Sequence, residues 1–403
     1  MGKNATFRRI QAIVLIILAI GLVTWVNYST LAAWSGGMTG RDFMSLWTGG
    51  KAIVLGLNPY DVEVWRPLRA AYGSNWMPDP ISPWPLWTHL FFVPFSFLTP
   101  QMAGALWMTI CELSLILGIA LVVQTAEGGG PSTFRLLLLG TFMFRPVFPA
   151  ISTGQLAAVL FLLLAAAYAL HERGHPFTAG FLLALMVVKP NATAILLVTV
   201  GLVFLVRRDW QALAGLVTGG LILLIVTWVI LPGWLLQWLA IAGKAQIARQ
   251  NPTIWGLTYE WGGKRLWPGS AVGTGGLLYL ALLFFLWKQR RGDWPFSVGL
   301  AVITSIFLAP YLWVYEQVVL LFPTIIALHW GLASKQGPRW AWWAGWWFTT
   351  VVLSWLLLFA AHRRGVDTWS AFMPLASLGY LLLAWRARRV GLQGVTIIDR
   401  EEE

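Results

Sequence analysis

Long apolar runs recur along most of this chain, and no other feature constrains the fold as strongly. A helix needs roughly 20 apolar residues to cross about 30 Å of hydrocarbon, and the runs reach or approach this length. They number about twelve, at 10–26, 101–123, 133–149, 154–170, 176–188, 191–206, 211–231, 271–287, 295–310, 316–331, 340–360 and 369–385. We therefore expect an all-α polytopic membrane protein whose helical bundle forms one transmembrane domain over residues 1–403.

The composition supports this expectation. Of the 403 residues, 58% are hydrophobic and 11% are charged, whereas a soluble domain carries about a quarter charged residues. Such a chain lacks the polar surface needed to fold in water, so membrane lipids are its solvent. Many of the 27 tryptophans stand at the ends of the runs, where the indole ring favours the membrane interface. Lys and Arg beside the runs account for the net charge of +12, so we expect no nucleic-acid partner.

The loop charges predict the orientation. Lys3, Arg8 and Arg9 precede the first run, and no small-x-small cleavage site follows Val26, so we interpret this run as an uncleaved helix with its N-terminus inside. Alternation then places the most basic loops in the cytoplasm, as the positive-inside rule requires. Both termini are predicted to be cytoplasmic, with a tail at 386–403. Two long loops, 27–100 and 232–270, are predicted to lie outside a prokaryotic plasma membrane.

The first outer loop is predicted to contain interfacial helices. Met44 to Leu55 reads as a helix that Gly56 ends, and a short apolar stretch from Trp87 to Leu98 is interrupted by Pro94. That stretch is too short to cross a membrane and fits an interfacial position. Ordered loops beside a rigid bundle often carry function.

Two acidic residues stand out. Asp42 begins the first loop helix near the outer interface, where the helix dipole favours a carboxylate that can accept a proton from a hydroxyl group. The plainer interpretation is a capping box with Thr39. Glu112 lies deep in an apolar run, where a carboxylate costs about 3 kcal/mol. It is paired, protonated or facing a cavity, and a hydrogen bond that joins two helices is the structural interpretation.

Basic residues at the outer ends of the runs are candidates for binding a phosphate. Lys189 and Arg145 each precede a proline, and the free amides of such a break, together with a cation, bind phosphate well. Arg41 and Arg249 could add to the same field. Snorkelling to lipid headgroups is the alternative. Gln155, after Gly154, offers an amide donor at the start of a run, although a packing role is equally compatible.

Several chemistries have no sequence support. The five histidines are scattered, and Cys111 is the single cysteine, so neither a metal motif nor an intramolecular disulfide can be formed. We expect no metal and no cofactor. The chain has no soluble domain that would bind a nucleotide sugar. If the chain transfers a sugar, we therefore expect the sugar donor to be attached to a lipid.

Several short motifs of the chain occur in an order that is typical of one protein family. The most specific are RDF at 41–43, KA at 51–52 and GLNPYD at 56–61. Weaker motifs follow in order: WPL at 84–86, VPF at 93–95, GQ at 154–155, AG at 179–180, VKP at 188–190 and PYLWVYE at 310–316. In these motifs the chain resembles glycosyltransferase family 87. The family has an asparagine where this chain has Ala157.

The resemblance implies a GT-C-like fold and a polyprenyl-phosphate-dependent hexosyltransferase, with mannose as the sugar and a lipid or glycan as the acceptor. It also implies that Asp42 is the general base of an inverting reaction. Lys189 and Arg145 would then stabilise the leaving phosphate, while Gln155, Tyr315 and Glu316 would line the substrate pocket. Two alternatives remain open: a transporter or flippase, and a polymerase or ligase, of polyprenyl-linked glycans.

Overall fold

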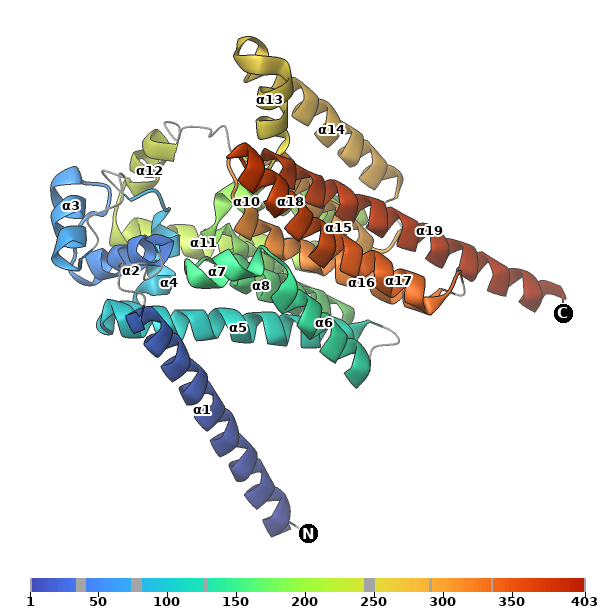
Figure 1. Cartoon of the computed structure of the whole chain (residues 1–403), viewed down its shortest axis with the longest axis horizontal. Helices are drawn as coiled ribbons and strands as arrows, with labels where there is room; N and C mark the ends of the chain where they lie inside the picture. Colours follow the sequence, from blue (N-terminus) through green and yellow to red (C-terminus); the bar gives the residue numbers. More distant parts are fainter. Residues whose placement is uncertain are drawn as a thin grey trace. The chain divides into compact units, whose positions relative to one another are not determined.

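The computed structural model describes residues 2–33, 41–73, 82–126, 130–242, 251–289, 292–334 and 336–401, and these ranges contain helices and no strand. The helices group into two compact units (Figure 1). Unit 1 comprises Met1–Leu113, Ile151–Gln155 and Thr227–Gly243, and unit 2 comprises Ser114–Ala150, Leu156–Val226 and Lys244–Glu403. The single domain expected over 1–403 stays a prediction.

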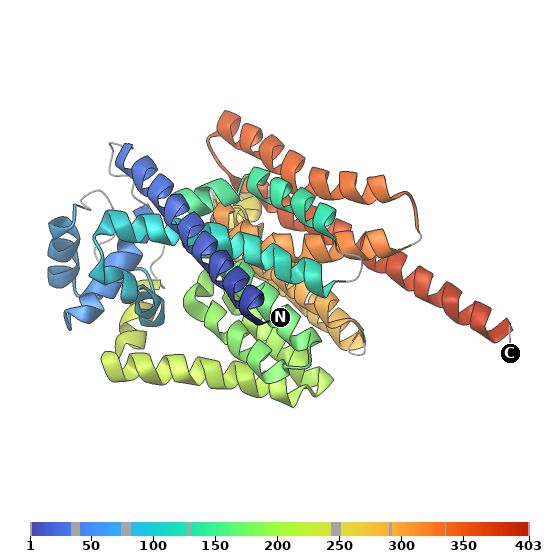
Figure 2. The same cartoon turned by 90° about the horizontal axis from the view of Figure 1, so that it is seen from below.

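Unit 1 is built around the first long loop, which was predicted at 27–100. Its elements are α1 (Gly2–Ala33), α2 (Arg41–Val54), α3 (Val62–Ala71), α4 (Leu86–Phe92), η1 (Pro94–Phe97), the first part of α5 (Pro100–Thr125) and α12 (Trp234–Ala242). The two views in Figures 1 and 2 agree that α1 approaches α5 near the C-terminal end of α1. There, Leu31 packs against Ala105 and Met108.

Unit 2 contains most of the apolar helices. They are α6 (Pro131–Met143), most of α7 (Val147–Ser152), α8 (Ala157–Glu172), α9 (Pro176–Leu185), η2 (Met186–Val188), α10 (Pro190–Arg207), most of α11 (Trp210–Ile230), α13 (Ile254–Leu266), α14 (Gly269–Lys288), α15 (Trp294–Leu308), η3 (Val314–Leu320), α16 (Leu321–Ala333), α17 (Arg339–Trp347), η4 (Phe348–Val352), α18 (Leu353–Arg364), η5 (Thr368–Ala371) and α19 (Phe372–Glu401). The buried centre lies on α15 and α16, whose side chains are almost all inaccessible.

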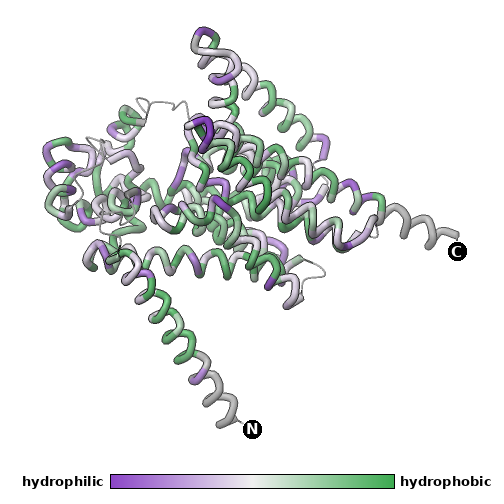
Figure 3. Tube along the Cα trace, viewed as in Figure 1, coloured by the Kyte–Doolittle hydropathy of each residue, from purple (hydrophilic) through white to green (hydrophobic). Residues whose placement is uncertain are grey.

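The expectation of a polytopic helical membrane protein is confirmed. In the described part of the chain, eight helices are long and apolar enough to cross a membrane, and three shorter apolar helices accompany them. Hydrophobic residues dominate these helices, and hydrophilic residues collect at their ends and in the connections (Figure 3). The run predicted at 133–149 is divided into α6 and α7, because α6 ends at Met143 and Arg145 and Pro146 follow its C-cap, Phe144. Whether the bundle has the GT-C arrangement stays a prediction.

The helices predicted in the first long loop are present. Helix α2 ends at Val54, and Gly56 has a φ of +66°, as a glycine after a helix C-terminus should. Pro94 separates α4 from η1 as expected. Thr39, the proposed capping residue, lies outside the described residues. The second long loop, predicted at 232–270, contains α12 and α13, and the residues assigned to the tail continue α19 as far as Glu401.

Helices α2 and α4 are in close contact because two glycines face α4. A Cβ atom added to Gly50 would lie 2.6 Å from the backbone of Phe92, and one added to Gly49 would overlap the ring of His89. Two hydrogen bonds extend the contact to η1, from Trp47 Nε1 to the Phe95 carbonyl at 3.0 Å and from Lys51 Nζ to the Ser96 carbonyl at 3.4 Å. The position of α2 is therefore set by backbone packing as well as by side chains.

We predict that Gly50→Ala destabilises the protein by about 1–3 kcal/mol, the usual cost of overpacking. The added methyl group meets main-chain atoms of Phe92, which cannot rotate away. Thermal unfolding in detergent measures the effect. Gly21→Ala in α1 is the control, because no atom lies within 4 Å of its new Cβ. Equal midpoints for the two variants would contradict the close contact between α2 and α4.

Candidate functional site

Asp42 lies in the first turn of α2 and is partly buried. A carboxylate in this turn interacts favourably with the unpaired amides at the helix N-terminus, so the position suits an ionised acid. In unit 1 its carboxylate receives a hydrogen bond from Gln155, whose Nε2 donates to Asp42 Oδ2. The two residues that the sequence analysis singled out separately are thus in direct contact.

Three hydrogen bonds fix the segment that carries Gln155. The Phe43 amide donates to the Thr153 carbonyl at 3.2 Å. Trp107 Nε1 donates to the Gly154 carbonyl at 2.9 Å, and the Cys111 thiol donates to the Gln155 carbonyl at 3.5 Å. Because the Gln155 side chain is fully buried, its amide has little freedom to turn away. The carboxylate of Asp42 is therefore held in one orientation.

Gly154 makes this arrangement possible. Its φ of +70° lies in the left-handed region that only glycine adopts without strain. A Cβ atom here would also lie 2.6 Å from Phe43 Cβ. The turn can therefore approach α2 closely enough for the hydrogen bond between Gln155 and Asp42.

Trp107 is a positioning residue that the sequence analysis missed. Its ring packs on Phe92 at 4.7 Å and on Phe95 at 5.4 Å between centroids, so it connects α4 and η1 to the turn at Gly154. The available signal was weak: a tryptophan in the interior of an apolar run needs a partner for its N–H group, but the sequence does not identify that partner.

Glu112 connects two helices of unit 1. Asn27 Nδ2 donates to Glu112 Oε2 at 3.2 Å and to Thr109 Oγ1 at 3.1 Å. Thr24 adds a contact of 3.1 Å to Thr109. Polar groups inside a membrane commonly join helices in this way. These contacts support the helix-joining interpretation of Glu112 that the sequence left open.

In unit 2, Lys189 forms a fully buried ion pair with Glu316, with Nζ 2.6 Å from Oε1. Lys189 stands between η2 and α10, where Pro190 begins the next helix, so the break predicted at this proline is present. The Trp313 amide donates to Glu316 Oε2 at 2.8 Å. The ammonium group also lies 4.8 Å from the centre of the partly buried Tyr315 ring.

Arg145 is likewise paired in unit 2. Its guanidinium contacts Asp367 through two bonds, Nη2 to Oδ2 at 2.7 Å and Nη1 to Oδ1 at 3.2 Å. Nη1 also donates to Ser370 Oγ at 3.0 Å. The side chain is 12% exposed, in contrast to the buried Lys189. An external phosphate can therefore reach Arg145 more easily than Lys189.

Arg41 and Arg249 are the two remaining residues that were predicted to bind the phosphate. The side chain of Arg41 and the whole of Arg249 lie outside the described part of the structure. Within the described ranges, no three His, Cys, Asp or Glu side chains come together as a metal site requires.

These features first define a class: a multi-pass helical membrane protein with a rigidly held carboxylate at the start of a loop helix. The family model described as glycosyltransferase family 87 matches residues 84–314. This is more than half of the chain, so the chain belongs to that family and is a membrane glycosyltransferase. No curated protein and no solved structure matched the chain. The matched range begins after Asp42, whose role therefore rests on the local geometry and on the resemblance at 41–61.

His89 is a buried histidine that no motif indicated. It lies on α4 in unit 1, its Nε2 atom is 2.6 Å from Ser82 Oγ, and its ring is fully inaccessible. Burial disfavours the charged ring and lowers the pKa of His89 from 6.5 to about 3. The imidazole is therefore neutral in the folded protein at physiological pH.

We predict that the free energy of unfolding decreases as the pH falls from about 6.5 towards 3. The unfolded chain takes up a proton on His89 in this range and the folded protein does not, so acid favours unfolding. Unfolding midpoints in detergent at several pH values measure the slope. His89→Gln should reduce the slope, whereas His362→Gln, at an exposed site, should leave it unchanged. A slope that His89→Gln leaves intact would contradict the prediction.

A second prediction concerns the buried ion pair. Lys189→Met leaves the Glu316 carboxylate buried without its cation, and such losses cost roughly 3–5 kcal/mol. The double variant Lys189→Met with Glu316→Gln removes both charges and should recover most of that stability. Unfolding midpoints of the two single variants and the double variant form the thermodynamic cycle. Additive losses in the double variant would show that the pair does not stabilise the fold through its charges.

Proposed function

We propose that this membrane glycosyltransferase transfers a hexose, with mannose as the proposed sugar, from a polyprenyl-phosphate donor to a hydroxyl group of a lipid or glycan acceptor. Family membership supports the transfer reaction. The absence of a nucleotide-binding motif from the sequence supports a lipid-linked donor, and the membrane spans offer surroundings for its chain.

In the proposed reaction Asp42 acts as general base. The acceptor oxygen attacks the anomeric carbon of the donor, and its proton passes to the Asp42 carboxylate. The bond between that carbon and the phosphate oxygen breaks with inversion, and polyprenyl phosphate leaves with the bonding electrons. Because a hydroxyl group is a poor nucleophile, a positioned base accelerates such steps by about 10²- to 10⁴-fold.

The contact between Gln155 and Asp42 is the observation that carries this proposal. A base is effective only when it is held in the correct geometry. The buried Gln155 amide holds the carboxylate, and Trp107, Cys111 and Phe43 hold the segment that bears Gln155. We propose that Gln155 serves the reaction by orienting the base, in addition to lining the substrate pocket.

The leaving phosphate needs a cation more than it needs a proton. We propose that Arg145 supplies this charge, because it is the more exposed of the two predicted cations and guanidinium binds phosphate through several bonds. The burial of Lys189 supports an indirect role, in which its contacts hold Glu316 and Tyr315 in place. Arg41 and Arg249 remain candidates for the same phosphate.

We place the reaction on the outer face of a prokaryotic plasma membrane, with both termini in the cytoplasm. The support is the distribution of Lys and Arg, which are concentrated in the loops of the opposite face. Labelling of a cysteine introduced beside Asp61 would report the side on which the first long loop lies. Protection of that cysteine from a membrane-impermeant reagent in intact cells would contradict this placement.

We predict that Asp42→Asn lowers the transfer rate by about 10²- to 10⁴-fold, since the amide cannot accept the proton. Gln155→Ala, which removes the orienting hydrogen bond, should lower it about tenfold or more. The assay follows polyprenyl phosphate released from polyprenyl-phosphate mannose by the purified protein in detergent. Asp61→Asn is the matched control, because Asp61 is an exposed N-cap of α3 and should affect stability only.

Three outcomes would overturn parts of the proposal. If the Asp42→Asn variant keeps full activity, Asp42 is not the general base. Movement of the intact donor across vesicles, without release of sugar, favours the flippase alternative. Transfer of a whole glycan chain in place of one hexose favours the polymerase or ligase alternative.

A further inference from the structure

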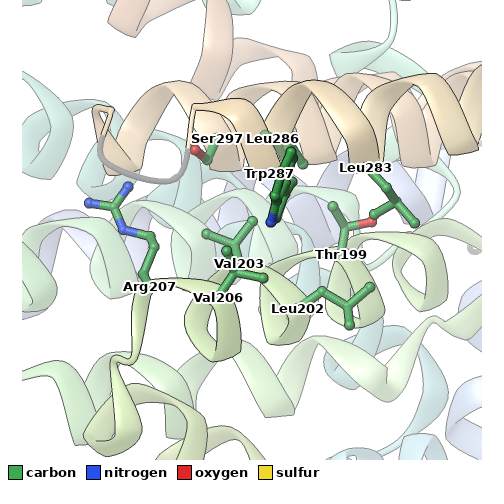
Figure 4. A pocket seen from close by; sticks show the side chains of 9 residues that line it. All are labelled: Thr199, Leu202, Val203, Val206, Arg207, Leu283, Leu286, Trp287 and Ser297. Atoms are coloured by element: carbon green, nitrogen blue, oxygen red, sulfur yellow. The ribbon is translucent and has the colours of Figure 1, made fainter.

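Helix α14 of unit 2 is separated from α10 by a narrow cavity of about 130 Å³ (Figure 4). Leu202, Val203 and Val206 of α10 form one wall, and Leu283, Leu286 and Trp287 of α14 form the other. The ends of the lining are marked by two hydroxyl groups, on Thr199 and Ser297, and by the guanidinium of Arg207. The cavity is therefore apolar along its length and cationic at one end.

The lining suits a hydrocarbon chain. Thr199 is hydrogen-bonded to the Ile195 carbonyl at 2.6 Å and to Tyr279 at 3.1 Å, and Ser297 donates to the Asp293 carbonyl at 3.4 Å. The two hydroxyl groups are thus satisfied by the protein. Leu202, Val206 and Trp287 are 36%, 38% and 52% exposed, so the cavity opens onto the surface that α10 and α14 present to the membrane.

The charges at the Arg207 end are mixed. Arg207 Nη1 donates to the Gly292 carbonyl at 2.6 Å. The carboxylates Asp209, Asp293 and Glu172 lie near enough to act on the Arg207 charge, while Arg388 contacts Asp293 and Arg389 contacts Gln289. Two of these carboxylates already have partners: Asp209 pairs with His171 at 2.8 Å, and Asp293 with Arg388 at 3.7 Å. Within the described residues, the remaining donors of the Arg207 guanidinium have no hydrogen-bond partner, so they can bind an anion at the mouth of the cavity.

We propose that this cavity is a binding site for an anionic phospholipid, with one acyl chain between α10 and α14 and the headgroup phosphate on Arg207. A phosphate gains charge-assisted hydrogen bonds from guanidinium, and an acyl chain in the cavity fills the gap between α10 and α14 and makes van der Waals contacts with its walls. The site is independent of the catalytic proposal, because it uses neither Asp42 nor its partners.

A second cavity in unit 2 provides an internal comparison. It has a volume of about 330 Å³ on the other side of α14, between α15 and α19, and its walls are apolar side chains with Thr304 and no charged residue. Lipid chains that enter this second cavity should not discriminate between headgroups. The headgroup preference is thus confined to the cavity that ends at Arg207.

The experiment uses the purified full-length protein in nanodiscs with a photoactivatable phospholipid that carries a diazirine in its acyl chain. The probe is phosphatidylglycerol in one preparation and phosphatidylcholine in the other, and mass spectrometry locates the crosslinks. We expect phosphatidylglycerol to exceed phosphatidylcholine several-fold at residues 199–206 and 283–287. The two probes should label the second cavity equally, at residues 300–308 and 375–382.

Matched variants test the two parts of the site. Arg207→Gln should lower labelling of the first cavity by phosphatidylglycerol about tenfold, whereas Arg208→Gln, one residue further at an exposed position outside the lining, should not. Val206→Phe fills the cavity and should reduce labelling by both probes. Its control is Leu205→Phe, on the same helix but outside the lining. Because Val206→Phe changes no charge, it still tests the cavity if Arg207→Gln fails to fold.

Several results would overturn the proposal. Equal labelling of the first cavity by the two probes would show that the cavity has no headgroup preference. Equal effects of Arg207→Gln and Arg208→Gln reduce it to a diffuse attraction between charges. Unlabelled lipids can be added as competitors of the phosphatidylglycerol probe. If polyprenyl phosphate lowers labelling of the first cavity more than phosphatidylglycerol does, the cavity binds the donor lipid instead.

Discussion

The hydrogen bond from Gln155 to Asp42 joins two segments of unit 1 that are far apart in sequence, and the candidate site depends on it. Neither partner is held by this bond alone. Helix α2 is seated on α4 through Gly49 and Gly50, while the turn at Gly154 is attached to α5 through Trp107. Each attachment removes freedom that the carboxylate or the amide would otherwise have, so the geometry is prepared before any substrate arrives.

A membrane bundle has little hydrophobic driving force between its helices, because lipid tails are as apolar as leucine. Polar contacts and close packing therefore carry much of the specificity. In unit 1 this role falls to Asn27, Thr109 and Glu112 between α1 and α5. In unit 2 the buried pair of Lys189 and Glu316 joins the start of α10 to η3.

The sequence predicts the elements well, because hydropathy and turn residues are local signals. The membrane spans, the end of α2 at Gly56 and the interruption at Pro94 all follow from residues that are neighbours in the chain. The pairings do not follow. Asp42 and Gln155, like Lys189 and Glu316, were singled out as separate candidates, and only the fold brings them together. Trp107 and His89 were missed, because nothing local distinguishes a positioning side chain from a core one.

The pair of Lys189 and Glu316 also bears on how the chain is assembled during synthesis. A lysine in apolar surroundings is unfavourable without a counter-ion, and α10 is made well before η3 and α16. An intermediate in which only the earlier helices have been inserted therefore carries the Lys189 charge at the membrane without its counter-ion. Insertion of the later helices brings Glu316 to Lys189 and neutralises that charge. The position of this salt bridge therefore stabilises the bundle only after the later helices have been inserted.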